Sequence, residues 1–192
     1  RANIIATYNW TINDFGRNST DITWTGATNT DWNTESNWNT IVVPASANNV
    51  TIPDVTNKPI ISSTTYARTN NITIGASGSL TIESGGSLKV FGTSSGNITY
   101  NVNVADDKWH LLSSPVVGEQ YSSGGWITDN SIDTNGAADN EGIAIYDNTT
   151  DADGDWSYYQ NNSGLINFNQ GQGYSLKRTG AGNYSYTGVF PD

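Results

Sequence analysis

Cysteine and methionine are both absent from this chain of 192 residues. Without cysteine there can be no disulfide, no thiolate nucleophile and no cysteine-ligated metal site. No apolar run approaches the roughly 20 residues that a transmembrane helix needs, and no signal peptide is recognisable. Because the chain starts at Arg1 and contains no methionine, we expect a processed or partial piece of a longer polypeptide.

Positive charge is scarce as well. Eight Lys and Arg residues stand against 18 Asp and Glu residues, the net charge is −10, and only 14% of the residues are charged. Phosphate groups are bound by clustered cations, and no basic run occurs in this chain. The composition therefore argues against nucleic acid and anionic lipid as partners, and it predicts a surface that is solvated largely by neutral polar side chains.

Residues suited to catalysis are few. His110 is the only histidine, and its place between Trp109 and Leu111 in an apolar, strand-like run favours a structural role over that of a general base. No Gly-x-Ser-x-Gly elbow is present, and zinc sites built on several histidines are excluded by count. Paired carboxylates for glycoside cleavage stay open, because spatial pairing is invisible in a sequence. We expect a protein that is not an enzyme.

What the chain does contain is a ladder of short strands spaced eight residues apart. The repeats are Ile72-Thr73-Ile74, Leu80-Thr81-Ile82 and Leu88-Lys89-Val90, with Gly- and Ser-rich turns between them. Each repeat places two apolar side chains on one face and a polar one on the other, which is typical of a strand. A unit this short can cover its apolar face only by stacking on other strands. We therefore predict solenoid-like stacked strands in preference to an antiparallel meander.

The chain divides into three stretches. Residues 1–20 predict a leading strand and a polar linker, and residues 21–104 contain a tryptophan-rich opening followed by the eight-residue ladder. Residues 105–192 alternate short strands with Asp-, Asn- and Gly-rich loops at a spacing that predicts a β-sandwich-like module, which we expect to be truncated. The predicted fold class is therefore all-β, with a short solenoid-like or stacked strand ladder followed by a β-sandwich-like module.

A characteristic order of motifs precedes and follows the ladder. It runs through Trp24-Thr25-Gly26, Asp31-Trp32-Asn33, Asn37-Trp38 and Val43-Pro44, and after the ladder through Trp109 to Pro115 and Gly171-Gln172-Gly173-Tyr174. This order resembles a Gly-rich β-repeat module of large secreted cell-surface proteins of the Bacteroidota, over residues 24–188 or so. The resemblance implies one module of an exported, multidomain, adhesin-like protein, often a cargo of type IX secretion, and it implies no catalytic residue.

Four tryptophans are candidate ligand-binding residues. Trp24, Trp32 and Trp38 lie in a segment with little other apolar content, and Trp126 follows in the third stretch. Indole rings stack on the C–H faces of sugars, so these residues could form a glycan platform. In the alternative interpretation, the first three close the open end of the ladder, whose last apolar layer needs a cap.

An acidic loop is the candidate metal site. Asp147, Asp151, Asp153 and Asp155 crowd four carboxylates into nine residues, and like charges at such density favour a counter-ion. Calcium prefers six to eight oxygen ligands from a flexible loop, so we consider a structural Ca²⁺ ion. The full EF-hand motif fails, since its first and twelfth positions lack carboxylates. A second loop, 133–141, has a similar composition, and a solvated acidic turn is the alternative for both.

These features predict a non-catalytic structural or adhesive module of an exported bacterial cell-surface protein, located outside the cell. One alternative is a carbohydrate-binding module of a secreted enzyme. Another is a self-assembling subunit of a surface layer or filament, in which residues 1–15 pair with a strand edge of a neighbour. The expected partners are other domains of the same polypeptide, further copies of the chain, and glycans, without nucleic acid or direct membrane insertion.

Overall fold

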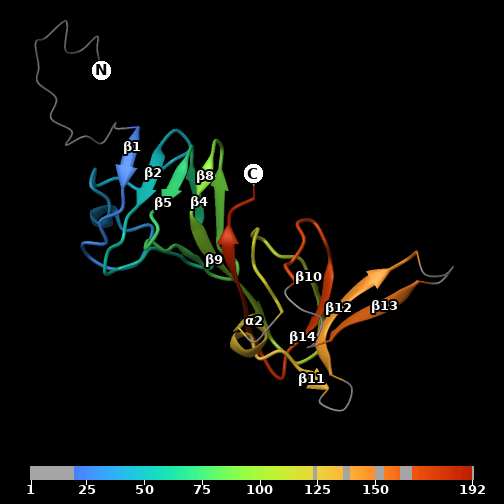
Figure 1. Cartoon of the computed structure of the whole chain (residues 1–192). Coiled ribbons are helices and arrows are strands. Elements are labelled where there is room, and N and C mark those ends of the chain that lie inside the picture. The colour runs from blue at the N-terminus through green and yellow to red at the C-terminus, as the bar shows by residue number, and fades with distance from the viewer. Residues whose placement is uncertain (1–19, 123–124, 136–138, 150–153, 161–165, 192) are drawn as a thin grey trace, which may run out of the picture.

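The computed structural model describes residues 20–122, 125–135, 139–149, 154–160 and 166–191. It confirms an all-β fold: over these residues the only helices are one short α-helix and one turn of 3-10 helix. Figure 1 shows stacked strands at one end of the molecule and a second sheet at the other, with two long strands running between them. The predicted leading strand lies almost wholly outside the described residues. No helix in the part of the chain that the structure describes is long and apolar enough to cross a membrane.

Short parallel sheets build the first lobe. Their strands are β1 (Asp21–Thr23), β2 (Asn49–Ile52), β5 (Ile72–Ile74) and β8 (Ser94–Ser95) in one sheet, β3 (Ile60–Ile61), β6 (Thr81–Ile82) and β9 (Asn97–Val104) in another, and β4 (Tyr66–Thr69) with β7 (Ser87–Val90) in a third. All pairs among these strands are parallel, so the antiparallel meander that we weighed as the alternative is wrong.

The register of these sheets corrects the prediction that strands eight residues apart stack on one another. Val50 lies opposite Ile72, 22 positions later, and Tyr66 lies opposite Ser87, 21 positions later. The three predicted repeats therefore do not stack on one another: β5, β6 and β7 each enter a different sheet. Each Gly-rich turn leads the chain from one sheet to the next. The turns also pack closely on one another, since a Cβ on Gly86 would lie only 2.6 Å from the carbonyl oxygen of Ser62.

The inward and outward positions of the ladder agree with the alternation in the sequence. The buried members are Ile72, Ile74, Leu80, Ile82 and Leu88. Thr73 and Lys89 are exposed, while Thr81 and Val90 are half-buried. Because a strand turns successive side chains to opposite faces, the apolar set of all three sheets meets in one interior. This continuous interior is what holds the first lobe together.

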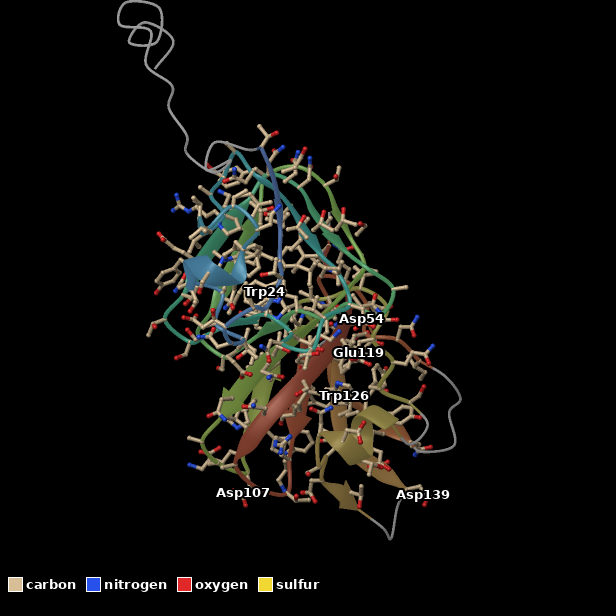
Figure 2. All side chains as sticks on the ribbon, turned by 90° about the vertical axis from the view of Figure 1, so that its left-hand side faces the viewer. Trp24, Asp54, Asp107, Glu119, Trp126 and Asp139 are labelled. Carbon is tan, nitrogen blue, oxygen red and sulfur yellow. The ribbon has the colours of Figure 1, made fainter. Side chains whose placement is uncertain are left out.

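The second lobe contains a five-stranded antiparallel sheet. Its order is β10 (Trp109–Leu112), β14 (Tyr174–Lys177), β12 (Asn140–Asp147) and β11 (Thr134–Asn135), with β13 (Asp155–Gln160) also paired to β12. One face packs on an aromatic cluster around α2 (Gly125–Asp129), made of Tyr121, Trp126, Phe168, Tyr174, Tyr184 and Tyr186. Figure 2 shows Trp126 beside this lobe's long C-terminal strand.

That C-terminal strand, β15 (Gly182–Val189), returns to the first lobe. It pairs antiparallel with β9 along its whole length, from Gly182 opposite Val104 to Val189 opposite Asn97. β9 ends at Val104 and β10 begins at Trp109, so the predicted boundary at residue 104 coincides with the end of a strand and stays a prediction. The returning strand nevertheless gives the stacked sheet a partner from the far end of the sequence, so the two lobes share the β9–β15 pair.

Candidate functional site

Large apolar side chains are exposed together on one face of the five-stranded sheet. They are Trp109 and Leu111 on β10, Tyr146 on β12, and Trp156 and Tyr158 on β13, with exposed fractions from 44% to 75%. Leu176, Ile143 and Tyr159 on the same strands are buried and face the aromatic cluster instead. We call the five exposed residues, with the surface between them, the aromatic groove.

The strand register explains why a groove forms. Leu111 lies opposite Ser175, Ser175 lies opposite Ala144, and Ala144 lies opposite Tyr158, so this row crosses four strands. Side chains of directly opposed residues point to the same face. The two middle members of the row are small, whereas its ends are large and apolar. The floor of the groove is therefore low and its two sides are high.

Two rings meet above this floor. The centroids of Trp109 and Tyr158 are 5.8 Å apart, although their strands are separated by β14 and β12. Three strand spacings amount to roughly 14 Å, so both rings must lean inward across the sheet. Ala144 and Ser175 beneath them are buried. The touching rings form a ridge that divides the groove in two.

Each side of the ridge has a hollow. The more apolar one has a volume of about 650 Å³ and is lined by Leu111, Leu112, Ser113, Tyr146, Trp156, Gln172, Gly173 and Tyr174. The more polar one has a volume of about 490 Å³ and is lined by Trp109, Asp133, Thr134, Asn140, Glu141, Gly142, Tyr158 and Lys177. In the first hollow the rings of Tyr146 and Trp156 are 5.3 Å apart and pack edge to face.

The polar hollow contains one ion pair and one further carboxyl group. Lys177 Nζ lies 2.5 Å from Asp133 Oδ2, and the hydrogen bond and the charge of this carboxylate raise the pKa of Lys177. Glu141 is buried, and burial together with the nearby Asp139 carboxylate raises its pKa. The groove thus presents ring faces, amides, hydroxyls and one buried carboxyl group, and its one lysine is already paired. Such a surface suits binding of an uncharged ligand.

The four tryptophans predicted as a glycan platform lie elsewhere, and that prediction is wrong. Trp24, Trp32 and Trp38 are at most 1% exposed and Trp126 is 5% exposed, so no indole face is free to stack on a sugar. Trp126 Nε1 donates to the carbonyl oxygen of Ser185 at 2.8 Å inside the second lobe. The sequence shows that these residues are aromatic but not which way they point.

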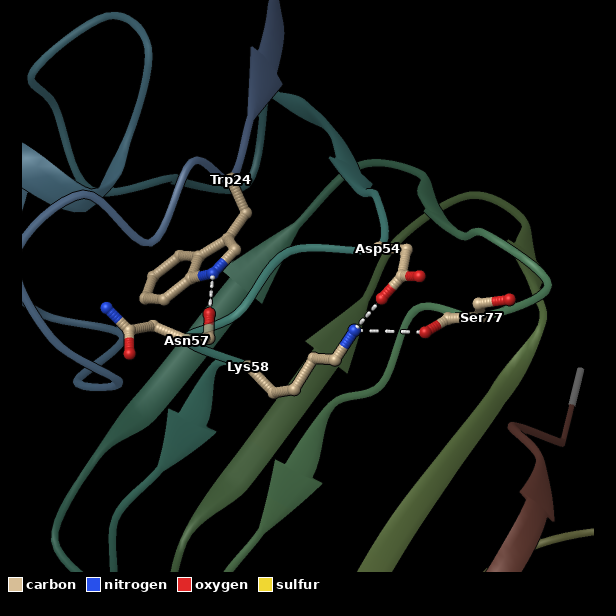
Figure 3. Close-up of polar contacts among 5 residues, drawn as sticks. All are labelled: Trp24, Asp54, Asn57, Lys58 and Ser77. Atoms are coloured by element: carbon tan, nitrogen blue, oxygen red, sulfur yellow. Dashed lines mark hydrogen bonds and ion pairs between the residues drawn. The ribbon is translucent and has the colours of Figure 1, made fainter.

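The first three tryptophans instead form the first apolar layer of the stacked strands, as the capping interpretation predicts. The ring centroids of Trp38 lie 4.9 Å from Trp24 and 4.8 Å from Trp32. Trp24 Nε1 donates to the carbonyl oxygen of Asn57 at 2.7 Å (Figure 3). In the same view Lys58 bridges Asp54 and the carbonyl oxygen of Ser77, which ties successive turns together.

Asn37 organises the loop that carries these tryptophans. Its buried Oδ1 accepts hydrogen bonds from the backbone N–H groups of Thr28 and Asn29, at 2.9 and 3.0 Å. Its Nδ2 donates to Asn29 Oδ1 and to the carbonyl oxygen of Asp31. Asp31 contributes as well, because its Oδ1 accepts a hydrogen bond from the backbone N–H of Asn33 at 3.1 Å. Such side-chain bonds to nearby backbone groups are typical of turns.

The predicted calcium ligands are only partly described. Asp147 lies opposite Asp155 at the end of the β12–β13 hairpin, while Asp151 and Asp153 lie outside the described residues. Hydrogen bonds from Thr149 lower the pKa of Asp147. Among the described residues no three His, Cys, Asp or Glu side chains are grouped to hold a metal ion. Calcium binding in this loop stays a prediction.

His110 lies 3.1 Å from a carboxylate, with its Nε2 facing Asp106 Oδ1. A hydrogen bond from the backbone of Lys108, with the charges of Lys108 and His110, lowers the pKa of Asp106. On β10 the histidine is opposite Leu176, whereas its neighbours Trp109 and Leu111 belong to the groove. Sequence reasoning assigned this segment to a strand but missed its exposed face. The alternation of Trp156-Ser157-Tyr158 and Trp109-His110-Leu111 was the available signal.

Comparison with known proteins gives one match. Residues 23–108 match a family described as a domain of unknown function, DUF8693. The matched segment covers the tryptophan-rich opening and the stacked strands and ends just before the aromatic groove begins at Trp109. No curated protein and no solved structure matches the chain.

Proposed function

We propose that this chain is a non-catalytic adhesive module of an exported bacterial cell-surface protein, which attaches through the aromatic groove. The stacked strands serve as the scaffold. The observation that carries the proposal is the groove itself: five large apolar side chains, two of them tryptophans, are exposed on one sheet face. Contiguous exposed apolar surface of this kind marks sites of interaction in soluble proteins.

The scaffold role has its own support. The parallel sheets enclose one continuous apolar interior, and their turns are bonded to one another through backbone and side-chain contacts. The order of tryptophan, proline and ladder motifs belongs to the resemblance, over residues 24–188 or so, to modules of secreted Bacteroidota surface proteins, and it supports an exported setting. Few charges and many neutral polar residues agree with that setting.

The proposal is tested by attachment. The fluorescently labelled full chain is applied to surfaces coated with cellulose, chitin, mucin or collagen, beside the double variant W109A/W156A. Tyr66→Ala is the matched control, because Tyr66 is an exposed aromatic residue on β4, in the other lobe. We expect retention on at least one surface, lost in the double variant and kept in the control.

Two results would overturn the proposal. One is a failure of the attachment pattern: either W109A/W156A is retained as well as the unaltered chain, or the unaltered chain is retained on none of the surfaces. The other is turnover: release of soluble sugar or peptide from a retained surface, abolished by Glu141→Gln or His110→Ala in a folded variant. Circular dichroism and the melting temperature of each variant establish that it is folded before attachment is compared.

A further inference from the structure

We infer that the ligand of the aromatic groove is a neutral, chain-like carbohydrate whose sugar rings stack on Trp156 in one hollow and on Trp109 in the other. This inference rests on the proposed attachment through the groove and goes beyond it by naming the chemical class of the ligand. It also moves carbohydrate binding from the four buried tryptophans to a different lobe and a different set of rings.

The first step concerns the rings. Trp109 is 45% exposed and Trp156 is 44% exposed, so nearly half of each side chain is open to solvent. Each ring also packs edge to face on a tyrosine, Trp109 on Tyr158 and Trp156 on Tyr146, which holds the indole plane in place. A fixed indole with a free surface can stack on the C–H side of a sugar at little entropic cost.

The second step concerns charge. Of the described residues that line the two hollows, Lys177 is the only cation, and Asp133 neutralises it at 2.5 Å. The other polar side chains around the rings are amides and hydroxyls, among them Gln172, Asn140 and Thr134, and the buried carboxyl group of Glu141. Amides both donate and accept hydrogen bonds, as sugar hydroxyls do. An anionic ligand would meet a chain of net charge −10 without a free cation in the groove.

The third step weighs a protein partner against a carbohydrate. An extended peptide binds by adding a strand to a free sheet edge. The centre of the groove is the face of β14 and β12, and β14 is paired on both sides. Among the described residues the edge strands are β10 and β13 at the borders of the groove, where an added strand would lie beside the groove and not on its face. A stable protein interface also needs roughly 20–30 residues on each side, far more than the groove provides. The geometry favours a narrow ligand that lies on a sheet face.

The fourth step concerns length. The ridge formed by Trp109 and Tyr158 separates hollows of about 650 and 490 Å³. A single sugar would occupy only one hollow and contact one indole. A chain that crosses the ridge contacts both indoles and brings its hydroxyls to the polar lining on each side. Affinity should therefore rise with the number of sugar units, because the second contact adds to the first.

The test is titration calorimetry of the full chain with neutral oligosaccharides of two to six units from β-glucan, xylan, mannan and chitin, and with polygalacturonate and heparin. Trp109→Ala and Trp156→Ala are compared with Tyr66→Ala, and Trp156→Phe tests whether a smaller ring restores part of the binding. We expect at least one neutral series to bind, more tightly with length. Either tryptophan variant should lose about tenfold in affinity, a loss of about 1.4 kcal/mol.

The outcomes separate the inference from the proposed function. If attachment depends on the groove but only polygalacturonate, heparin or a protein coating binds, the inference is wrong and the adhesive role stands. If a neutral oligosaccharide binds equally well to W109A/W156A, both the inference and the groove's role in attachment are wrong. Equal affinity for two and six units would overturn the chain-like ligand that spans both hollows.

Discussion

Truncation of Ile82 to alanine tests the stacked interior most directly. Ile82 is fully buried on β6 and lies in register between Ile61 on β3 and Tyr100 on β9. The substitution removes three carbon atoms, each worth about 0.8 kcal/mol of burial, which gives about 2.4 kcal/mol. The cavity left between two fixed neighbours adds to this cost, so we expect a loss of about 3–4 kcal/mol in the free energy of unfolding.

Urea unfolding followed by tryptophan fluorescence measures this loss, because the three buried tryptophans of the first lobe report on its interior. Thr73→Ala, at an exposed position of β5, is the control and should change the free energy of unfolding by less than about 0.5 kcal/mol. The double variant I61A/I82A should show a coupling of more than about 0.5 kcal/mol, while I82A/I143A, with its two sites in different lobes, should be additive. A loss below about 1 kcal/mol for Ile82→Ala, or no coupling with Ile61, would refute the stacked register.

Three further predictions concern the opening loop, pH and calcium. Asn37→Ala should lower the free energy of unfolding by about 2–4 kcal/mol, because two backbone N–H groups lose their acceptor. A loss below about 0.5 kcal/mol, as expected for the exposed control Thr73→Ala, would contradict this role. Burial raises the pKa of Glu119 above its ordinary 4.5, so the folded chain retains a proton that the unfolded chain releases. Stability should therefore decline as pH rises through that raised pKa, with a shallower decline in Glu119→Gln, and identical pH profiles would refute it. Millimolar Ca²⁺ should raise the melting temperature and Asp153→Ala should abolish that rise, whereas no shift in the unaltered chain would exclude the site.

The pattern of apolar residues was enough to predict strands and their faces. In Ile72-Thr73-Ile74 the alternation assigns the buried and exposed positions correctly, because side chains on a strand turn to opposite faces whatever the partner strand is. The same reasoning gives an almost helix-free chain. The spacing of eight residues, however, gives only the distance along the chain to the next strand, which belongs to a different sheet. The strands that pair with β6 are β3 and β9, one from an earlier and one from a later part of the chain. Their identity depends on all the turns between them and not on the spacing of a single repeat.

For the candidate site, too, the sequence predicts the faces of the strands but not which strands lie side by side. The sequence alone determined that Trp109, Leu111, Trp156 and Tyr158 alternate with other residues on strands, so each could have one exposed face. It could not bring them together, because they come from strands 45 residues and more apart, such as Leu111 and Trp156, and meet only through β14 and β12 between them. It also could not distinguish them from Trp24, Trp32 and Trp38, which have the same chemistry. Only the tertiary structure decided which tryptophans fill an interior and which border a groove, since burial depends on the strands packed above a side chain.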